Sequence, residues 1–160
     1  MSFARIIGQE QLKRRLGTSL AGDPGHAFLF TGSSGAGKTL VARAFGKALL
    51  CRTPSPDGAC DRCDACRLFE EGVHPDWRSL ESSDGKGIRV ERVRTDIVAD
   101  VTLYPQMGGR KVYLVDADHL NEQGQNALLK TIEEPPPHVC ILMTASGPER
   151  LAGTIVSRMV

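Results

Sequence analysis

The sequence has few aromatic residues, no long hydrophobic run and no excess of charge of either sign. Aromatic residues make up 5% of its 160 residues, so a surface that stacks successive bases of single-stranded nucleic acid is not indicated. Its apolar runs are all far shorter than the roughly 20 residues of a membrane-spanning helix, and no charged and then apolar leader opens the chain. We therefore expect a soluble, cytoplasmic protein that does not bind a membrane.

Charge is balanced, because 20 Lys and Arg residues face 19 Asp and Glu residues. Such a chain has no strong overall field that would attract nucleic acid. Any DNA contact must come from a local basic patch, for example Arg89, Arg92 and Arg94 near the start of a predicted helix. These arginines could equally form a solvated helix face, so no residue is assigned to DNA. The length fits one domain with a substantial core, in which about 70% of the unfolded surface is buried.

A glycine-rich segment between a predicted strand and a predicted helix is the most informative motif. It fits the pattern G-x-x-x-x-G-K-[ST] at every position, and its residues are Gly32, Ser33, Ser34, Gly35, Ala36, Gly37, Lys38 and Thr39. Such a loop directs backbone N–H groups and a helix N-terminus at one point, which suits a polyphosphate. We expect Lys38 to reach the β- and γ-phosphates of ATP and Thr39 to help hold Mg²⁺. The alternative is a chance glycine-rich turn.

Four of the five cysteines lie close together in the chain. Cys51, Cys60, Cys63 and Cys66 follow the spacing C-x8-C-x2-C-x2-C. Thiolates so spaced can converge on one tetrahedral zinc ion, and paired disulfides are improbable in a cytoplasmic protein. The sequence therefore predicts a structural zinc insert at about residues 51–66, with free thiols or a redox role as the alternative. Cys140, inside an apolar run, is predicted to be a small buried hydrophobic residue.

Hydrophobic patterning outside these motifs alternates between helices and strands. It predicts strands at 27–31, 77–80, 111–116 and 139–144, and helices at about 9–21, 38–50, 64–72, 90–104 and 121–134. The strands are continuously apolar, which favours a parallel sheet with helices on both faces. The expected fold class is α/β.

Several segments together resemble the AAA+ module of bacterial clamp-loader subunits, which open the sliding clamp for DNA polymerase III. They are residues 7–10, 26–30, the glycine-rich loop, the four-cysteine insert, 126–136 and Ser157–Arg158. The resemblance implies a P-loop NTPase (AAA+) domain over residues 1–160, the N-terminal part of a longer protein whose lid and collar domains are absent from this chain. It also implies partners. These are the tau/gamma and delta subunits of a hetero-pentamer that loads the clamp onto primed DNA during replication, within the nucleotidyltransferase holoenzyme.

Two subunit types of that family compete. Residues 74–76, 86–90 and 121–125 resemble the delta-prime subunit. In that role the chain would bind ATP, hydrolyse it weakly or not at all, and lend an arginine to a neighbouring subunit. The alternative is a tau/gamma-type motor subunit that hydrolyses ATP itself.

The predicted strand at 111–116 bears on this choice, because in the family it ends in two adjacent acids. Here Asp116 can serve Mg²⁺, but the next residue is Ala117, which cannot orient water. Asp118, one position further, is a weak candidate for a catalytic acid and is otherwise a solvated loop residue. The imidazole of His119 is expected to be solvated or bonded to backbone.

The resemblance implies two further site residues. The arginine of the Ser-Arg pair, Arg158, is expected to act as a finger in trans on a neighbour's nucleotide. Thr144, or else Ser146, is expected to sense the γ-phosphate at the end of the last predicted strand, although a hydroxyl there could instead satisfy a backbone group.

Overall fold

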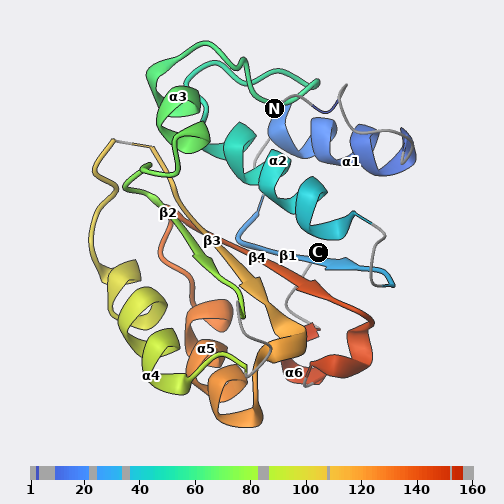
Figure 1. Cartoon of the computed structure of the whole chain (residues 1–160), viewed down its shortest axis with the longest axis vertical. Coiled ribbons are helices and arrows are strands. Elements are labelled where there is room, and N and C mark those ends of the chain that lie inside the picture. The colour runs from blue at the N-terminus through green and yellow to red at the C-terminus, as the bar shows by residue number, and fades with distance from the viewer. Residues whose placement is uncertain are drawn as a thin grey trace.

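A four-stranded parallel sheet lies between two layers of helices in the computed structural model (Figure 1), which describes residues 3, 10–21, 25–33, 37–82, 87–107, 109–151 and 153–156. The strand order is β1-β4-β3-β2. The strands are β1 (Ala27–Thr31), β2 (Trp77–Leu80), β3 (Lys111–Asp116) and β4 (Val139–Ala145). The predicted α/β class and the four predicted strands are confirmed. The insertion of β4 between β1 and β3 was not predicted.

One face of the sheet carries α1 and α2 and the other carries α4, α5 and α6, while α3 lies at the outer end of α2 (Figure 1). The helices are α1 (Glu10–Ala21), α2 (Lys38–Leu50), α3 (Asp64–Glu70), α4 (Val90–Val93), α5 (Glu122–Glu133) and α6 (Gly153–Val156). Asn121 caps α5 as expected, because its side chain accepts a hydrogen bond from the Gly124 N–H at 2.8 Å.

The helix predicted over residues 90–104 is not a regular α-helix. After α4 the chain continues as a π-helical turn over Arg94–Val98 and a 3₁₀ turn over Asp100–Thr102. This change of winding keeps the apolar stripe facing the sheet, since Val93, Ile97 and Val101 are all at most 5% exposed. The apolar periodicity thus predicted the buried face but not the helix type.

Side-chain alternation along the strands divides the core in two. Phe28, Leu114 and Leu142 point to the α2 side, where they pack with Phe45. Their neighbours in sequence point to the opposite layer; Met143 is an example. Because both faces are covered, the central strand β4 is almost entirely apolar and all seven of its residues are buried, whereas the edge strand β2 also carries Arg78 and Ser79.

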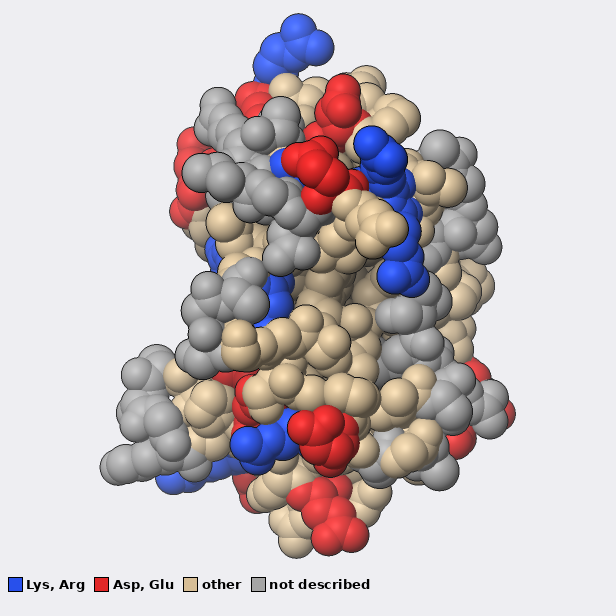
Figure 2. All heavy atoms as spheres, turned by 90° about the vertical axis from the view of Figure 1, so that its right-hand side faces the viewer, with Lys and Arg blue, Asp and Glu red and all other residues tan. Residues whose placement is uncertain are grey.

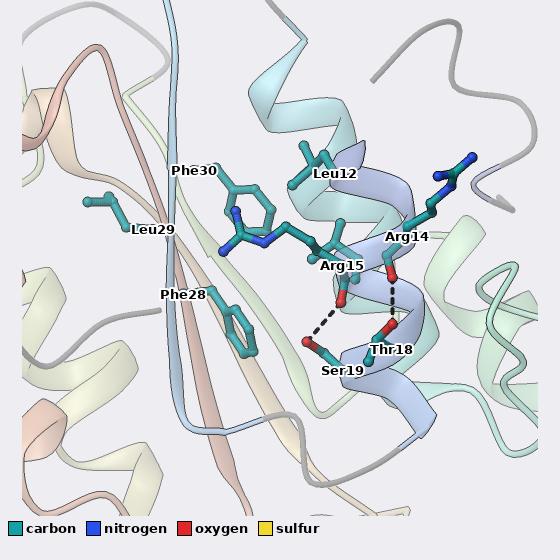
Figure 3. Close-up of a pocket in the computed structure, with 9 residues that line it drawn as sticks. Leu12, Arg14, Arg15, Thr18, Ser19, Phe28, Leu29 and Phe30 are labelled. Atoms are coloured by element: carbon teal, nitrogen blue, oxygen red, sulfur yellow. Dashed lines mark hydrogen bonds between the residues drawn. The ribbon is translucent and has the colours of Figure 1, made fainter. Parts of the chain in front are cut away.

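The outer side of β1 is an open edge among the described residues, since β1 pairs only with β4 there. A cavity of about 360 Å³ lies between β1 and α1. Phe28 and Phe30 point into it and Leu29 points away (Figure 3). Seen from this side, the cavity opens on a tan hollow bordered by blue basic side chains (Figure 2). No described helix is long and apolar enough to span a membrane.

Candidate nucleotide site and metal centre

The glycine-rich segment connects β1 to α2 as predicted. The Gly32 N–H donates to the Ala145 carbonyl of β4 at 3.2 Å, which ties the start of the loop to the neighbouring strand. Gly37, the N-cap of α2, has φ +81°. A side chain in this left-handed conformation costs about 1–2 kcal/mol, so glycine is favoured at this position. Ser34, Gly35 and Ala36 lie outside the described residues.

Among the described residues, no side chain caps the N-terminus of α2. Gly37 has no side chain that could cap the helix, and the first N–H groups of a helix lack partners within it. Lys38 is the first helical residue, and its Nζ donates to the Ser33 carbonyl at 3.4 Å, so the side chain folds back over the loop. Thr39 follows and is exposed. The described part of the loop therefore brings a lysine and an uncapped helix N-terminus together.

Asp116 and Thr144 lie side by side on the face of the sheet that α2 covers. They are register partners at the ends of β3 and β4, and alternation places them on the same side as Leu114 and Leu142. Thr144 is 3% exposed. Both predicted cofactor residues thus lie on the same face as the helix that carries Lys38.

The expectation for His119 missed a carboxylate partner. Its Nδ1 lies 2.6 Å from Oδ2 of Asp116, while its side chain remains 37% exposed to solvent. The reason is local: the chain turns into a 3₁₀ helix over Ala117–His119, which brings position i+3 back to the strand end. In the sequence, only the three-residue spacing of Asp116 and His119 could have indicated this contact. That spacing predicts a contact only if the 3₁₀ turn is already known.

Asp118 connects the ends of β3 and β4. Its carboxylate accepts the Ser146 N–H at 3.0 and 3.1 Å and the Ser146 hydroxyl at 3.2 Å. Arg150 completes the group, because its Nε donates to the Ser146 Oγ at 3.2 Å and lies 3.9 Å from the Asp118 carboxylate. Ala117 between the two acids is 1% exposed and belongs to the core. Sequence reasoning missed Arg150, which lies in no motif. Arg158 lies outside the described residues.

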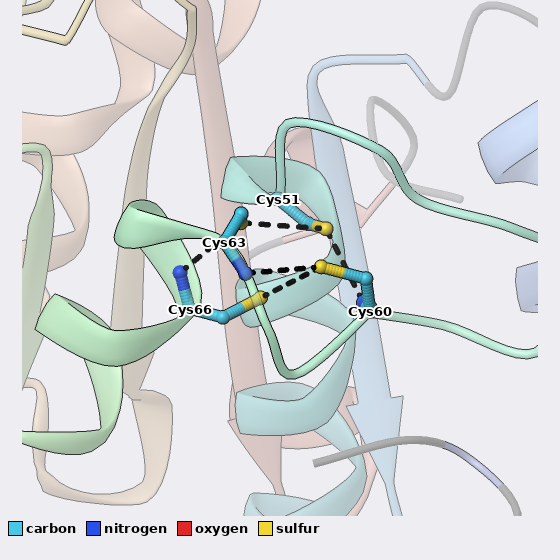
Figure 4. A group of neighbouring side chains, drawn as sticks. All are labelled: Cys51, Cys60, Cys63 and Cys66. Atoms are coloured by element: carbon cyan, nitrogen blue, oxygen red, sulfur yellow. Dashed lines mark hydrogen bonds between the residues drawn. The ribbon is translucent and has the colours of Figure 1, made fainter.

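The four clustered cysteines converge (Figure 4), and their sulfur atoms all lie within 4.8 Å of one another. Cys60 and Cys66 are 4.0 Å apart and Cys51 and Cys63 are 3.9 Å apart, sulfur to sulfur. A regular tetrahedron with Zn–S bonds of about 2.3 Å has edges of roughly 3.8 Å. The residues therefore fit a tetrahedral ion held by four thiolates.

Backbone N–H groups favour the thiolate form of some of these cysteines, whereas burial raises the pKa of Cys51 and Cys66. The N–H groups of Arg62 and Cys63 each donate to the Cys60 sulfur at 3.3 Å. These bonds, that of Arg62 first, lower the pKa of Cys60 to about 6. Further N–H groups donate to Cys51 and Cys63 at 3.3 and 3.4 Å. Such bonds orient ligands and stabilise their charge in metal sites. Cys140 is fully buried in β4, as predicted, and burial raises its pKa to about 12.

Over residues 8–160 the sequence matches the family described as DNA polymerase III, delta subunit. The chain belongs to this family. It is 40% identical over 159 residues to DNA polymerase III subunit tau of Escherichia coli, covering 98% of this chain and 24% of that protein. It is 44% identical over 137 residues to subunit delta' of Pseudomonas aeruginosa, covering 84% of this chain and 42% of that protein. The family resemblance expected from the motifs is therefore confirmed.

Solved structures show the same fold. A gamma subunit-related protein of Thermotoga maritima superposes with a TM-score of 0.59 at 24% identity, covering 94% of this chain and 43% of that one. A RuvB variant of the same organism also gives 0.59, at 18% identity, covering 99% of this chain and 45% of that one. The chain spans 24% of the length of the tau relative and 42% of the length of the delta' relative.

Proposed function

We propose that this chain is the AAA+ nucleotide-binding domain of a delta-prime-type clamp-loader subunit of bacterial DNA polymerase III. In this role it binds ATP with Mg²⁺, hydrolyses it weakly or not at all, and works with tau/gamma and delta subunits in a hetero-pentamer. The complex loads the sliding clamp onto primed DNA in the cytoplasm. Family membership supports the clamp-loader part, and the relatives named tau and delta' support the choice of partners.

Binding of nucleotide is supported by the N-terminus of α2, which no described side chain caps. Lys38 bonds to the Ser33 carbonyl of the loop, and Asp116 and Thr144 lie on the α2 side of the sheet. A carboxylate at a strand end and a threonine hydroxyl are ligands that Mg²⁺ accepts. We assign Asp116 and Thr39 to Mg²⁺, Thr144 to the γ-phosphate, and the backbone of residues 32–37 to the phosphates.

One observation carries the proposal of weak hydrolysis: the acid that follows β3, Asp118, is bonded to Ser146. Ala117 cannot polarise water, and Asp118 is bonded to Ser146 at 3.0–3.2 Å. Phosphoryl transfer depends on a correctly placed group that orients the nucleophile, and a displacement of about 1 Å can reduce the rate ~10²-fold. We therefore assign Asp118 a structural role rather than a catalytic one.

We assign structural zinc to Cys51, Cys60, Cys63 and Cys66, because their sulfur spacing matches a tetrahedral site. Zinc would supply a cross-link between the end of α2 and the insert. With four sulfur ligands it has no open coordination position for substrate.

The test uses the full-length protein, alone and assembled with its partner subunits. Alone, it should bind ATP with turnover close to background. Lys38→Ala should weaken ATP binding, and the exposed residue Lys130 on α5 provides the control substitution Lys130→Ala. Arg158→Ala should leave its own ATP affinity intact and lower the ATPase rate of the assembled complex, by up to ~10³-fold at the site it serves. Normal activity of that mutant complex would remove the finger from the proposal.

A second candidate, a tau/gamma-type motor subunit, is favoured by the 40% identity to tau over 98% of this chain. It predicts rapid ATP hydrolysis by the protein itself. Turnover by the purified full-length protein therefore separates the two candidates.

A further inference from the structure

Helix α2 is shared by the two candidate sites. It begins at Lys38, directly after the glycine-rich loop, and Cys51 follows its last residue as the C-cap. At 1.5 Å per residue its 13 residues extend about 20 Å. A single helix therefore joins the predicted phosphate contacts to the first predicted metal ligand.

Lys47 makes a second connection between α2 and the cysteine insert. It lies in the last turn of α2 with its side chain 2% exposed. Its Nζ is 2.6 Å from Oδ1 of Asp61 and 2.6 Å from Oε1 of Glu70. Burial opposes the charge of the ammonium group, but the carboxylates of Asp61 and Glu70 raise the pKa of Lys47 above its usual value. Lys47 is thus a buried, charged residue that joins α2 to the cysteine insert through two ion pairs.

The partners of Lys47 lie in the segments that the cysteines organise. Asp61 follows Cys60 in the tight turn toward Cys63 and has φ +62°, an unusual conformation for a non-glycine residue. Glu70 ends α3, the helix that Cys63 caps by accepting the Cys66 N–H. A metal held by four thiolates would fix this turn and the start of α3. It would thereby also hold in place the two carboxylates that bond to Lys47 of α2.

We propose that Lys47 is a positioning residue that couples the metal centre to the nucleotide site through α2. With metal bound, the insert holds α2 where Lys38 and Thr39 meet the phosphates, so that metal and nucleotide bind cooperatively. Without metal the insert loosens, and α2 has to be fixed in position when nucleotide binds, which weakens binding. By linkage, nucleotide must tighten metal binding by the same factor. This inference rests on the proposed ATP and metal sites.

The test measures ATP affinity of the full-length protein in its metal-loaded and chelator-stripped forms. In the wild type we expect stripping to weaken ATP binding about tenfold. In Lys47→Met the ATP affinities of the metal-loaded and stripped forms should agree within about twofold. The thiolate-to-Co²⁺ absorption band that appears when Co²⁺ is added shows that the cysteines of the variant still bind metal. Lys47→Arg should restore most of the coupling, because it keeps the charge. The matched control is Lys130→Met, which alters an exposed lysine in the last turn of α5.

Two further measurements test the inference if a variant or the stripped protein does not fold. If Lys47→Met does not fold, Glu70→Gln removes one ion pair from a carboxylate that is 56% exposed, and it should reduce the coupling partially. If the stripped protein unfolds, the reciprocal experiment is used: ATP should slow the loss of Co²⁺ to a chelator in the wild type but not in the variant. Equal ATP affinity with and without metal in the folded wild type, or full coupling in Lys47→Met, would overturn this inference alone. Absence of ATP binding in every metal-loaded form would overturn the proposed function as well.

Discussion

Replacing Asp118 distinguishes a structural from a catalytic carboxylate. Asp118→Asn keeps the shape of the side chain but removes its charge from the bonds to Ser146 at 3.0, 3.1 and 3.2 Å. Hydrogen bonds to a charged group contribute about 1.5–3 kcal/mol, and neutral ones about 0.5–1.5 kcal/mol. The substitution should therefore reduce the free energy of unfolding by about 1 kcal/mol. The ion pair with Arg150, whose side chain is 59% exposed, adds at most a few tenths of a kcal/mol.

Two assays are read together for this variant. Urea unfolding of the 160-residue chain, followed by the fluorescence of its single tryptophan, Trp77, should show the loss of stability. ATP turnover by the full-length protein, alone and assembled, should not change. Ser146→Ala serves as the control, because it keeps the Ser146 N–H bonds to Asp118 and removes only the two bonds of the hydroxyl, to Asp118 and from Arg150; its effect should be smaller. Brisk turnover by the wild-type protein that Asp118→Asn abolishes at unchanged stability would refute a structural role.

Three other predictions concern stability. Gly46→Ala should lower the free energy of unfolding by about 1–3 kcal/mol, because an added Cβ would lie 2.3 Å from the Trp77 ring. Replacing the ring with Trp77→Leu should relieve the effect, and since that variant has no tryptophan, its urea unfolding is followed by circular dichroism. Asp100→Asn should lower the free energy of unfolding by about 3 kcal/mol in urea. The substitution removes the negative charge that lies 2.7 Å from the Nζ of the buried Lys111. Burial opposes the charge of Asp100, but hydrogen bonds from Lys111 and Tyr113 hold its pKa below the usual value. Its stabilisation is present above the unfolded pKa of about 3.9 and is lost as pH falls further, so wild-type stability should drop more steeply below about pH 4 than that of Asp100→Asn. Chelation should lower the thermal midpoint, and added Zn²⁺ should restore it unless the cysteines hold no metal.

Local patterns predicted the elements because each element has a local cause. Apolar runs bounded by glycine and proline gave the strands, and the capping residue Asn121 gave the start of α5. Strand order was not predictable, since a parallel strand can follow its crossover helix to either side of its predecessor. The π-helical turn at Arg94–Val98 also has no local signal, because its apolar spacing fits a regular α-helix equally well.

The same distinction applies to the candidate sites. The loop glycines and the cysteine spacing are contiguous motifs, so both could be located in the sequence. The bonds of Asp118 to Ser146, 28 residues away, and of Lys47 to Glu70, 23 residues away, exist only after the sheet and the insert have folded. These long-range bonds decide what the acids and the lysine can do.

The outer side of β1 has a practical consequence for handling the protein. No described strand pairs with this edge, and its backbone N–H and C=O groups, next to an aromatic hollow, offer a template on which another extended segment can add. Preparations of these 160 residues alone should therefore self-associate at high concentration, and light scattering should rise steeply as added salt screens the neighbouring arginines.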